Sequence, residues 1–485
     1  MLSTLFQPKK PTKKEWLTMI AICVVGSILC MGLMYAKSKA ENPFYGDASD
    51  YVRGAFTLYH HGVFSQHISI TMPPAGLGRE PAYAFVLSLW AYLDSGFQSL
   101  TIQCLEAISC SKEQFVGAQW FNRFLFALSG VLMFIAGYLA SGRLLGATIA
   151  GGAIWFNKHM QKNMDYIVSD PLALMLSSFL LLLLVVIAVK KRENKPVVFL
   201  WALAGGVLAA LTLTKAVFYY FGLLFIATFV VYCIYKIFCK QQDRFLTTVR
   251  FLLFSVCFIV PVFMWMERNN DISGERIITP SRAGIALNTR EVLNHMTPAQ
   301  YFTSFLYWTR GFGDNWARAL LPKEIWTEFE IANPDGFYLK AQLGYPKLVK
   351  EVMLKEGVNK TVASKMVDRR LMMDIVSNPI THVLVTIPVF YYGIWVDQFA
   401  FLSVPFFFWC LWLAWKKREF ALPLILAPSL FNMIFYALIS LNIPRYQMTA
   451  VPGLALALAI GFCIWAEQGR FQKLQIFLLR RRPKG

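Results

Sequence analysis

Apolar runs alternate with short polar or basic segments along almost the whole chain. A helix that crosses a membrane needs about 20 mainly apolar residues. Runs of this length, with somewhat shorter ones between them, predict ten membrane spans and hence an all-α polytopic membrane protein. They lie near residues 16–36, 119–141, 144–158, 170–189, 197–213, 216–236, 247–266, 397–415, 420–441 and 446–466.

The basic residues between the runs predict the orientation of the spans. Short cytoplasmic loops of membrane proteins are enriched in Lys and Arg. With the N-terminus inside, the basic clusters of the short loops all fall on the cytoplasmic side, as does the tail ending "RRRPKG". Counting residues 382–396 as one more span would move "WKKRE" (415–419) outside, and residues 81–93 raise the same problem. Ten is therefore the smallest consistent number of spans, and twelve preserves the same orientation.

This topology leaves two long segments outside the cytoplasm, residues 37–118 and 267–396. We therefore expect an N-terminal membrane module over residues 1–267, a periplasmic helical loop over 268–396, and C-terminal spans with a basic cytoplasmic tail over 397–485. The clearest amphipathic stretch of the loop is residues 358–379, which ends at Asn378-Pro379. We expect this loop to form a cap over a site at the membrane surface.

A helix is predicted at the start of the first outer segment. Tyr51, Ala55, Leu58 and Tyr59 recur at spacings of three and four, as on one face of a helix. Asp47 or Ser49 would make a natural N-cap, and Asp50 a cap or first-turn residue. Gly62, after the His60-His61 pair, would end the helix.

Composition supports a membrane protein and excludes several other classes. The chain has 485 residues, of which 56% are hydrophobic and 15% charged, and its mean hydropathy is +0.48. Its net charge of +19 reflects clusters that flank apolar runs, so it indicates topology rather than nucleic-acid binding. His60, His61 and His67 lack the spacing of a zinc motif, and no nucleotide-binding motif appears. We therefore expect no metal ligands among them and no soluble cofactor.

Two of the nine cysteines, Cys104 and Cys110, fall outside the cytoplasm in this topology. In an oxidising compartment they could form a local disulfide. If the intervening residues were helical, however, the six-residue spacing would hold the two sulfurs apart and leave free thiols. The sequence leaves both alternatives open.

Several segments resemble the GT-C superfamily of glycosyltransferases, in particular the branch of protein O-mannosyltransferases and lipid A aminoarabinose transferases. The resemblance begins with "GDASDYVRGAFTLYHHGVFS" (46–65) and "GREPAYAFVLSLW" (78–90), which are similar to the first periplasmic loop of that branch. It continues in the same order with "WFNRFLFALSGVLMFIAG" (120–137), "MDYIVSDPLALMLSSFLLLLL" (164–184), "GGVLAALTLTKAVFYYF" (205–221), "MERNNDISGERIITPSRAGIALN" (266–288) and "PRYQMTAVPGLALALAIG" (444–461). One departure is that the branch often has Asp-Glu where this chain has Asp47-Ala48, which leaves a requirement for a divalent metal open.

The resemblance implies a GT-C-like transmembrane bundle of about ten to twelve spans, with periplasmic juxtamembrane helices, in a bacterial inner membrane. Both termini would be cytoplasmic. The implied activity moves a sugar from a polyprenyl-phosphate donor to a periplasmic acceptor, which could be a lipid, a glycan or a protein. An inverting displacement needs one carboxylate to take the proton of the acceptor hydroxyl, and cations to stabilise the departing phosphate.

Asp47 is the predicted general base, and Asp170 is a second candidate catalytic acid that could equally cap its helix. Most candidate cations lie at span ends, where Lys and Arg also serve as interfacial anchors. The residues expected to bind the substrate are Tyr51, Arg79, Glu80, Arg123, Lys215, Arg268 and Arg445.

A membrane transporter or lipid flippase is the alternative from another functional class. Transporters place polar groups at the middle of the membrane on broken, repeated helices. Here the candidate charges lie in outer loops and at span ends, which favours the glycosyltransferase. An inactive scaffold of the same fold is a third alternative.

Overall fold

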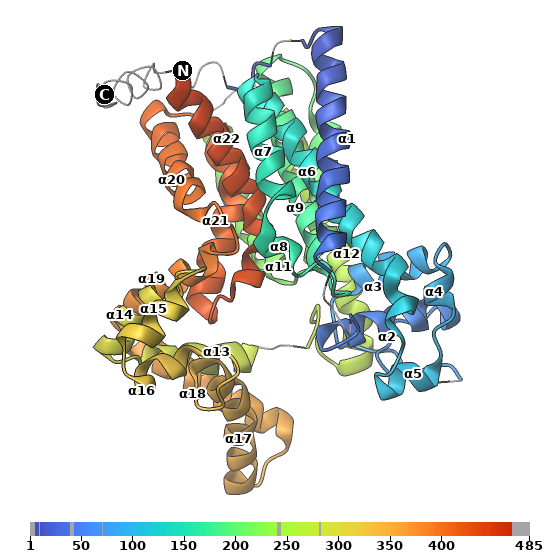
Figure 1. Cartoon of the computed structure of the whole chain (residues 1–485), viewed down its shortest axis with the longest axis vertical. Helices are drawn as coiled ribbons and strands as arrows, with labels where there is room; N and C mark the ends of the chain where they lie inside the picture. Colours follow the sequence, from blue (N-terminus) through green and yellow to red (C-terminus); the bar gives the residue numbers. More distant parts are fainter. Residues whose placement is uncertain are drawn as a thin grey trace, which may run out of the picture. The chain divides into compact units, whose positions relative to one another are not determined.

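The computed structural model describes residues 5–8, 10–38, 43–69, 71–239, 244–280 and 283–467 (Figure 1). These residues form helices, turns and loops, and none of them lies in a β-strand. The chain divides into two compact units. The membrane unit comprises residues 5–280, 398–429 and 449–467, and the second unit comprises residues 283–397 and 430–448.

Most of the membrane unit is built from long helices. The unit also has shorter helices in residues 37–118, which we call the first loop. Its elements are α1 (Lys13–Ala36), α2 (Asp47–His61), α3 (Pro81–Ala91), α4 (Ser95–Gln98), α5 (Ile102–Ala107), η2 (Lys112–Phe115), α6 (Val116–Ser141), α7 (Leu144–Trp155), α8 (Lys158–Gln161), α9 (Asp170–Arg192), α10 (Val198–Thr212), α11 (Val217–Phe238), α12 (Arg244–Ser273), α20 (Ala400–Lys417) and α22 (Val451–Glu467). Two more elements, α21 (Ala421–Ile439) and η4 (Pro444–Ala450), have residues in both units.

Seven helical stretches among the described residues are long and apolar enough to cross a membrane, so the chain is a multi-pass membrane protein. They are α1, η2 with α6, α9, α11, α12, α21, and η4 with α22. Three other predicted spans correspond to α7, α10 and α20, which have 12, 15 and 18 residues. At 1.5 Å per residue, α7 and α10 are shorter than a hydrocarbon core of about 30 Å. That they cross stays a prediction.

Close helix packing in the membrane unit depends on small residues opposite one aromatic ring. The Trp155 indole lies against Gly130, where an added Cβ would come within 2.1 Å of its Nε1. That nitrogen donates a hydrogen bond to the Ala127 carbonyl oxygen at 2.9 Å. Glycine at position 130 therefore lets α6 and α7 approach closely.

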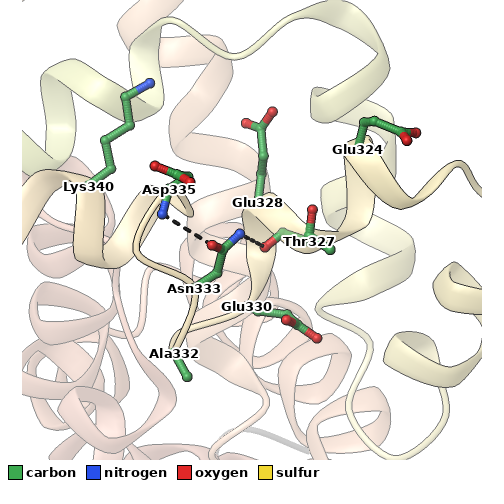
Figure 2. Close-up of a pocket in the computed structure, with 8 residues that line it drawn as sticks. All are labelled: Glu324, Thr327, Glu328, Glu330, Ala332, Asn333, Asp335 and Lys340. Atoms are coloured by element: carbon green, nitrogen blue, oxygen red, sulfur yellow. Dashed lines mark hydrogen bonds between the residues drawn. The ribbon is translucent and has the colours of Figure 1, made fainter.

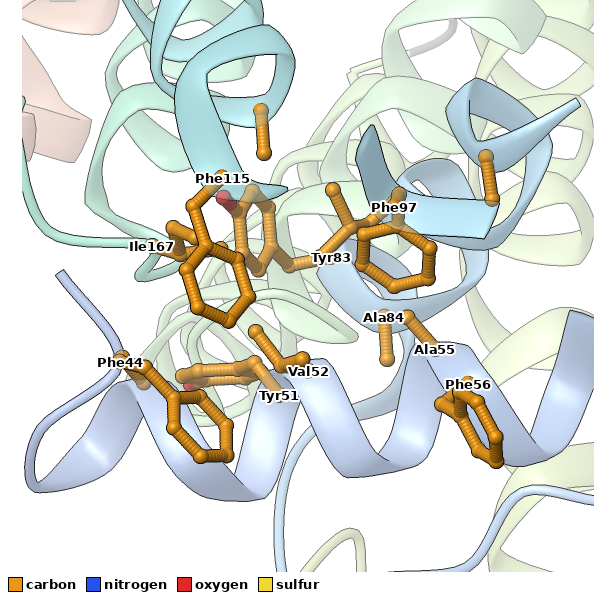
Figure 3. Packing of buried hydrophobic residues seen from close by; sticks show 14 of the residues in the cluster. Phe44, Tyr51, Val52, Ala55, Phe56, Tyr83, Ala84, Phe97, Phe115 and Ile167 are labelled. Atoms are coloured by element: carbon orange, nitrogen blue, oxygen red, sulfur yellow. The ribbon is translucent and has the colours of Figure 1, made fainter. Parts of the chain in front are cut away.

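The first loop has its own apolar core beneath the predicted helix α2. Tyr51, Val52 and Ala55 of α2 are buried with Tyr83 and Ala84 of α3, and Figure 3 shows these side chains in one cluster. The predicted helix and its helical face are therefore confirmed.

The two ends of α2 differ in how well the sequence predicted them. The expected cap at Asp47 or Ser49 is wrong, because the N-cap is Gly46, with φ of +66° and no side-chain hydrogen bond. The side chain of Asp47, the first helical residue, contacts an arginine instead of capping the helix. At the other end, Gly62 is left-handed with φ of +67°, as predicted.

Cys104 and Cys110 form a disulfide, which decides between the two alternatives left by the sequence. The helix α5 ends at Ala107, and Ile108 adopts a left-handed conformation with φ of +53°, so the six residues are not one continuous helix. The reversal brings the two Cα atoms to 4.6 Å. The carbonyl oxygen of Leu105, within α5, accepts hydrogen bonds from the Arg53 guanidinium of α2.

The disulfide predicts a simple difference in thiol labelling. The seven other cysteines are free, so denatured protein without reductant should take up seven maleimide groups and reduced protein nine. Intact mass spectrometry of the purified full chain measures both values. The variant Cys104→Ser with Cys110→Ser is the control and should take up seven groups with or without reductant. Nine groups on unreduced wild-type protein would contradict the disulfide.

The second unit consists of shorter helices around two apolar clusters. Its elements are α13 (Ala283–Asn294), α14 (Pro298–Tyr307), α15 (Gly313–Leu320), α16 (Lys323–Trp326), η3 (Thr327–Phe329), α17 (Phe337–Glu356), α18 (Lys360–Ser377) and α19 (Pro379–Ile394). The predicted amphipathic stretch is the helix α18, which Asn359 caps through a hydrogen bond from the Val362 amide. It ends just before Pro379, as expected where proline disfavours helix at the preceding residue.

Candidate functional site

Arg79 binds both aspartates at the start of α2. Its Nη2 lies 2.5 Å from Asp47 Oδ1, and its Nε lies 2.9 Å from Asp50 Oδ2. The aspartates are three residues apart and share one helix face, which allows one guanidinium to reach both. Arg79 is 11% exposed, whereas the two aspartate side chains are 33% and 34% exposed. The buried guanidinium therefore holds both carboxylates in place, and the carboxylates remain accessible to a ligand.

The charge state of Arg79 follows from these neighbours. Burial lowers the pKa of its guanidinium and the carboxylates of Asp47 and Asp50 raise it, and the net pKa is raised. The guanidinium also lies 5.7 Å from the centroid of the Tyr51 ring. Arg79 is thus a permanent cation between two carboxylates.

Tyr51 and Glu80 extend the arrangement toward the membrane helices. The Tyr51 hydroxyl lies 3.0 Å from Ser169 Oγ and donates to Glu80 Oε2 at 3.4 Å. Burial raises the pKa of Tyr51 well above its ordinary value, and the Glu80 carboxylate raises it further, so the phenol stays protonated. The other oxygen of Glu80 accepts a hydrogen bond from the Ala216 amide at 3.3 Å.

Asp170 and Lys215 form an ion pair at the ends of two membrane helices. Lys215 Nζ lies 2.8 Å from Asp170 Oδ1. Asp170 is the first residue of α9 and is 2% exposed, while Lys215 lies in the break between α10 and α11 and is 22% exposed. The expected alternative, a capping role for Asp170, is not seen, because the N-cap is Ser169 and makes no side-chain cap bond.

These contacts bring together residues from four parts of the chain, in a group that we name the acid–base cluster. The Asp170–Lys215 pair is linked to the rest through the neighbouring residues Ser169 and Ala216. The contributing parts are the first turn of α2, the segment before α3, the start of α9 and the break between α10 and α11. The cluster has four carboxylates and two cations, together with two hydroxyl groups. Its members are Asp47, Asp50, Tyr51, Arg79, Glu80, Ser169, Asp170 and Lys215.

Arg123 lies in a second, fully buried ion pair. Its Nη2 is 2.9 Å from Asp165 Oδ1, and the two side chains are 2% and 9% exposed. The guanidinium also lies beside the stacked rings of Tyr35 and Trp120, at 5.6 and 5.0 Å from their centroids. A group enclosed in this way supports the packing of α6, and its predicted contact with substrate stays a prediction.

Arg268 holds the backbone of the first loop. It donates to the carbonyl oxygens of Gly76 at 2.5 Å and Phe64 at 3.1 Å, and its guanidinium lies 4.6 Å from the Trp265 ring centroid. None of its described hydrogen bonds reaches a residue of the acid–base cluster. Arg445 belongs to η4 and to the second unit, so its predicted role at this site also stays a prediction.

Sequence reasoning missed three polar residues that the structure places at or beside the cluster. Ser169 contacts Tyr51, Asp165 pairs with Arg123, and Asn122 accepts a hydrogen bond from the Tyr83 hydroxyl at 2.8 Å. Asp165 and Ser169 lie in the short segment that leads into Asp170, the first residue of α9. The polar residues of this segment could have indicated Asp165 and Ser169 as site residues, but only Asp170 is predicted from the sequence.

The acid–base cluster does not fit a divalent metal. Across the described ranges, no three side chains of His, Cys, Asp or Glu are grouped so that they could hold a metal ion. Between Asp47 and Asp50 the position that a cation would take is filled by the Arg79 guanidinium.

The second unit contains an acidic concavity of about 630 Å³ between α16 and α17 (Figure 2). Some of its polar groups already have partners, since Glu330 pairs with Arg318, which does not line the concavity, and Asn333 donates to the Thr327 carbonyl oxygen. The lining residues are Glu324, Thr327, Glu328, Glu330, Ala332, Asn333, Asp335 and Lys340. No sequence motif predicts a site there.

Comparison with known proteins finds distant structural similarity and no sequence match. No family model and no curated protein matches this chain. Its structure is similar to an oligosaccharyltransferase from Archaeoglobus fulgidus, AglB, solved with an inhibitory peptide and a dolichol-phosphate, at 12% identity over 96% of this chain and a TM-score of 0.46. The chain spans about half of that enzyme, 52% of its length.

It is also similar to ArnT from Cupriavidus metallidurans bound to undecaprenyl phosphate, at 12% identity over 95% of this chain and 80% of ArnT, with a TM-score of 0.35. The apo state of ArnT gives the same TM-score at 11% identity over 92% of this chain and 77% of ArnT. Because these TM-scores are below 0.5, we infer the function from the residues of the acid–base cluster.

Proposed function

We propose that this protein is a membrane glycosyltransferase that moves a sugar from a polyprenyl-phosphate donor to an acceptor hydroxyl on the outer, non-cytoplasmic side of its membrane. The observation that carries the proposal is the acid–base cluster, in which accessible carboxylates and two cations meet at the ends of membrane helices. Such a site offers a base for the acceptor and positive charge for the departing phosphate. The disulfide between Cys104 and Cys110 supports an oxidising, outer location for the first loop.

Asp47 is the base in this reaction. Its carboxylate takes the proton as the acceptor oxygen attacks the anomeric carbon of the sugar. The bond between that carbon and the phosphate oxygen breaks, its electron pair leaves with the polyprenyl phosphate, and the configuration inverts. Arg79 fixes the direction of the Asp47 carboxylate, because one guanidinium nitrogen lies 2.5 Å from it. Asp50, bound to the same guanidinium, holds Arg79 in place.

Lys215 is the cation that meets the phosphate in this proposal. It is partly exposed at a helix break, so its ammonium group can contact a lipid head group at the membrane surface. Asp170 is buried behind it and orients it, so we assign Asp170 a positioning role. Tyr51 and Glu80 connect the two halves of the site, through Ser169 on one side and the Ala216 amide on the other.

The biological setting proposed here follows from the same features. The protein is a multi-pass protein of a bacterial inner membrane with both termini in the cytoplasm. Its donor is a polyprenyl-phosphate-linked sugar, such as one carried on undecaprenyl phosphate, and its acceptor is a lipid, glycan or protein on the periplasmic side. No metal takes part in the step described.

Binding of undecaprenyl phosphate to the purified full chain tests the role of Lys215. We expect Lys215→Gln to weaken binding by about 10–100-fold, since a hydrogen bond to a charged group contributes roughly 1.5–3 kcal/mol. Native mass spectrometry in detergent gives the affinity. Lys215→Arg keeps the charge beside Asp170 and should retain most of the binding.

Lys191→Gln is the matched control, because Lys191 is an exposed cation in the last turn of α9, at the opposite end of the helix from Asp170. This variant should bind like the wild type. Equal affinities for Lys215→Gln and Lys191→Gln would remove Lys215 from the phosphate site.

A further inference from the structure

The helix α18 in the second unit has two apolar faces, and only one of them is buried. Ala363, Val367, Leu371 and Ile375 recur at spacings of four and pack against α17 and α13. On the opposite face, four apolar side chains are exposed at fractions between 42% and 66%. They are Val362, Met366, Met373 and Val376. A helix that only packed on its own unit would carry polar residues there.

Cations surround this exposed face. Arg369 lies on the same side of the helix as Met366 and Met373, while Lys365 and Arg370 lie along its two edges, and all three are exposed. Apolar residues flanked by long basic side chains are typical of helices that lie in the interface of a membrane. The cations then reach lipid phosphates while their stems cover apolar surface.

The adjoining helix places this face at the end of a membrane span. The helices α18 and α19 meet at an angle of 94°. Arg290 donates to the carbonyl oxygen of Ala437, in the last turn of the candidate span α21, and to Nδ1 of His382, near the start of α19, at 2.9 Å. Val385 and Val389 of α19 pack in the same cluster as Ala437. The junction of α18 and α19 therefore lies close to where α21 leaves the membrane.

The exposed face of α19 is apolar as well, so the exposed apolar surface continues through the bend. Ile380, Val383, Leu384 and Ile387, spaced as one helix face, are 49% to 76% exposed. A helix that dips toward the hydrocarbon beside a span, followed at nearly a right angle by a helix with a basic amphipathic face, fits a membrane surface.

The partner helix α17 shows what a solvated face of the same unit looks like. Its outward side carries the exposed charged residues Lys347, Lys350 and Glu351. The exposed Leu343 and Leu354 come before and after them in the sequence. Because α17 and α18 pack through their inner faces, these residues point away from the exposed face of α18. The α18 side combines contiguous apolar residues with three cations, of which Arg370, at the edge, also lies 4.0 Å from the exposed Asp374 carboxylate.

We propose that α18 lies flat on the membrane, with Val362, Met366, Met373 and Val376 inserted among the lipid head groups and the three cations bound to lipid phosphates. The partner is the bilayer itself, preferably one with anionic lipids. This interaction would anchor the second unit to the surface at which α21 ends. It is independent of the proposed glycosyltransferase activity, because it involves no residue of the acid–base cluster.

Photo-crosslinking of the full chain in lipid nanodiscs tests the proposal. A p-benzoylphenylalanine is placed at Met373 or, as the control, at Leu354, which is more exposed at 77% against 53%. In discs made of phosphatidylcholine and phosphatidylglycerol, intact mass spectrometry counts chains that gain the mass of one phospholipid. We expect on the order of tenfold more lipid adduct at position 373, because interfacial helices insert about 5–10 Å into the head-group region.

The contribution of the cations has its own comparison. The change Arg369→Gln with Arg370→Gln should reduce the adduct at position 373 in the mixed discs to the level found in discs of phosphatidylcholine alone. The control Lys347→Gln with Lys350→Gln, on the outward side of α17, should leave it unchanged. Equal lipid adducts at positions 373 and 354 would overturn the proposal, and so would an adduct at 373 with a second copy of the chain in place of lipid.

Discussion

Replacement of Asp47 by asparagine is expected to lower the rate of sugar transfer by about 10²–10⁴-fold, the range that a general base contributes. Asparagine has nearly the same shape but cannot take the proton of the acceptor. The purified full chain is assayed with a polyprenyl-phosphate sugar and a membrane extract as acceptor source. Release of polyprenyl phosphate is the signal.

Folding should survive this change, because the Asp47 side chain is a third exposed and Arg79 keeps its contact with Asp50. Asp50→Asn is the matched control, since Asp50 lies on the same turn and binds the same guanidinium. It should lose activity less severely than Asp47→Asn. If Asp47→Asn transfers sugar at the wild-type rate, Asp47 is not the base.

The largest effect on stability is expected at the buried pair of Arg123 and Asp165. Arg123→Met leaves the Asp165 carboxylate without its cation in a site where both side chains are less than 10% exposed. Removing one member of a buried pair typically costs about 3–5 kcal/mol. Thermal unfolding of the detergent-solubilised chain should show a clear fall in the transition temperature.

A second replacement separates charge from packing at this pair. Arg123→Met combined with Asp165→Leu removes both charges and should recover much of the loss, because an apolar pair often replaces a buried ion pair without penalty. Glu193→Gln, which breaks a pair in which Lys195 and Glu193 are 62% and 43% exposed, should change little. A single variant Arg123→Met as stable as Glu193→Gln would show that the buried pair is dispensable.

Local patterns predicted the elements near the site well. The spacing of Tyr51 and Ala55 identified the buried face of α2, and Gly62 identified its end. The buried face and the end of α2 depend on residues within one or two helical turns, so the local sequence is enough to predict them. The helix α18 and its end before Pro379 were predicted for the same reason.

Contacts between distant segments were not predictable in the same way. The pairing of Arg79 with both aspartates joins residues about thirty positions apart, and it makes Asp47 and Asp50 partners of one cation, which their positions in the sequence do not indicate. Lys215 and Asp170 were both singled out, but nothing local shows that they meet. Such pairs depend on how α2, α9 and the break after α10 come together.

Span prediction was limited by length rather than by composition. The segments around α7 and α10 are strongly apolar, but their helices have only 12 and 15 residues. Hydropathy reports how apolar a run is, whereas the helix ends depend on turn residues such as Asn157 and on tertiary packing. The orientation inferred from basic loops treats α7 and α10 as crossings and stays a prediction.

The disulfide of the first loop has a consequence for the biogenesis of the protein. Cys104 lies within α5 and Cys110 follows that helix. The Leu105 carbonyl oxygen of α5 binds Arg53, which belongs to the helix that begins with Asp47. Oxidation after translocation would thus complete the support of α2 only once the loop has left the reducing cytosol. Until then the proposed base would lack part of its framework, so maturation of the site would depend on the thiol-oxidising capacity of the cell envelope.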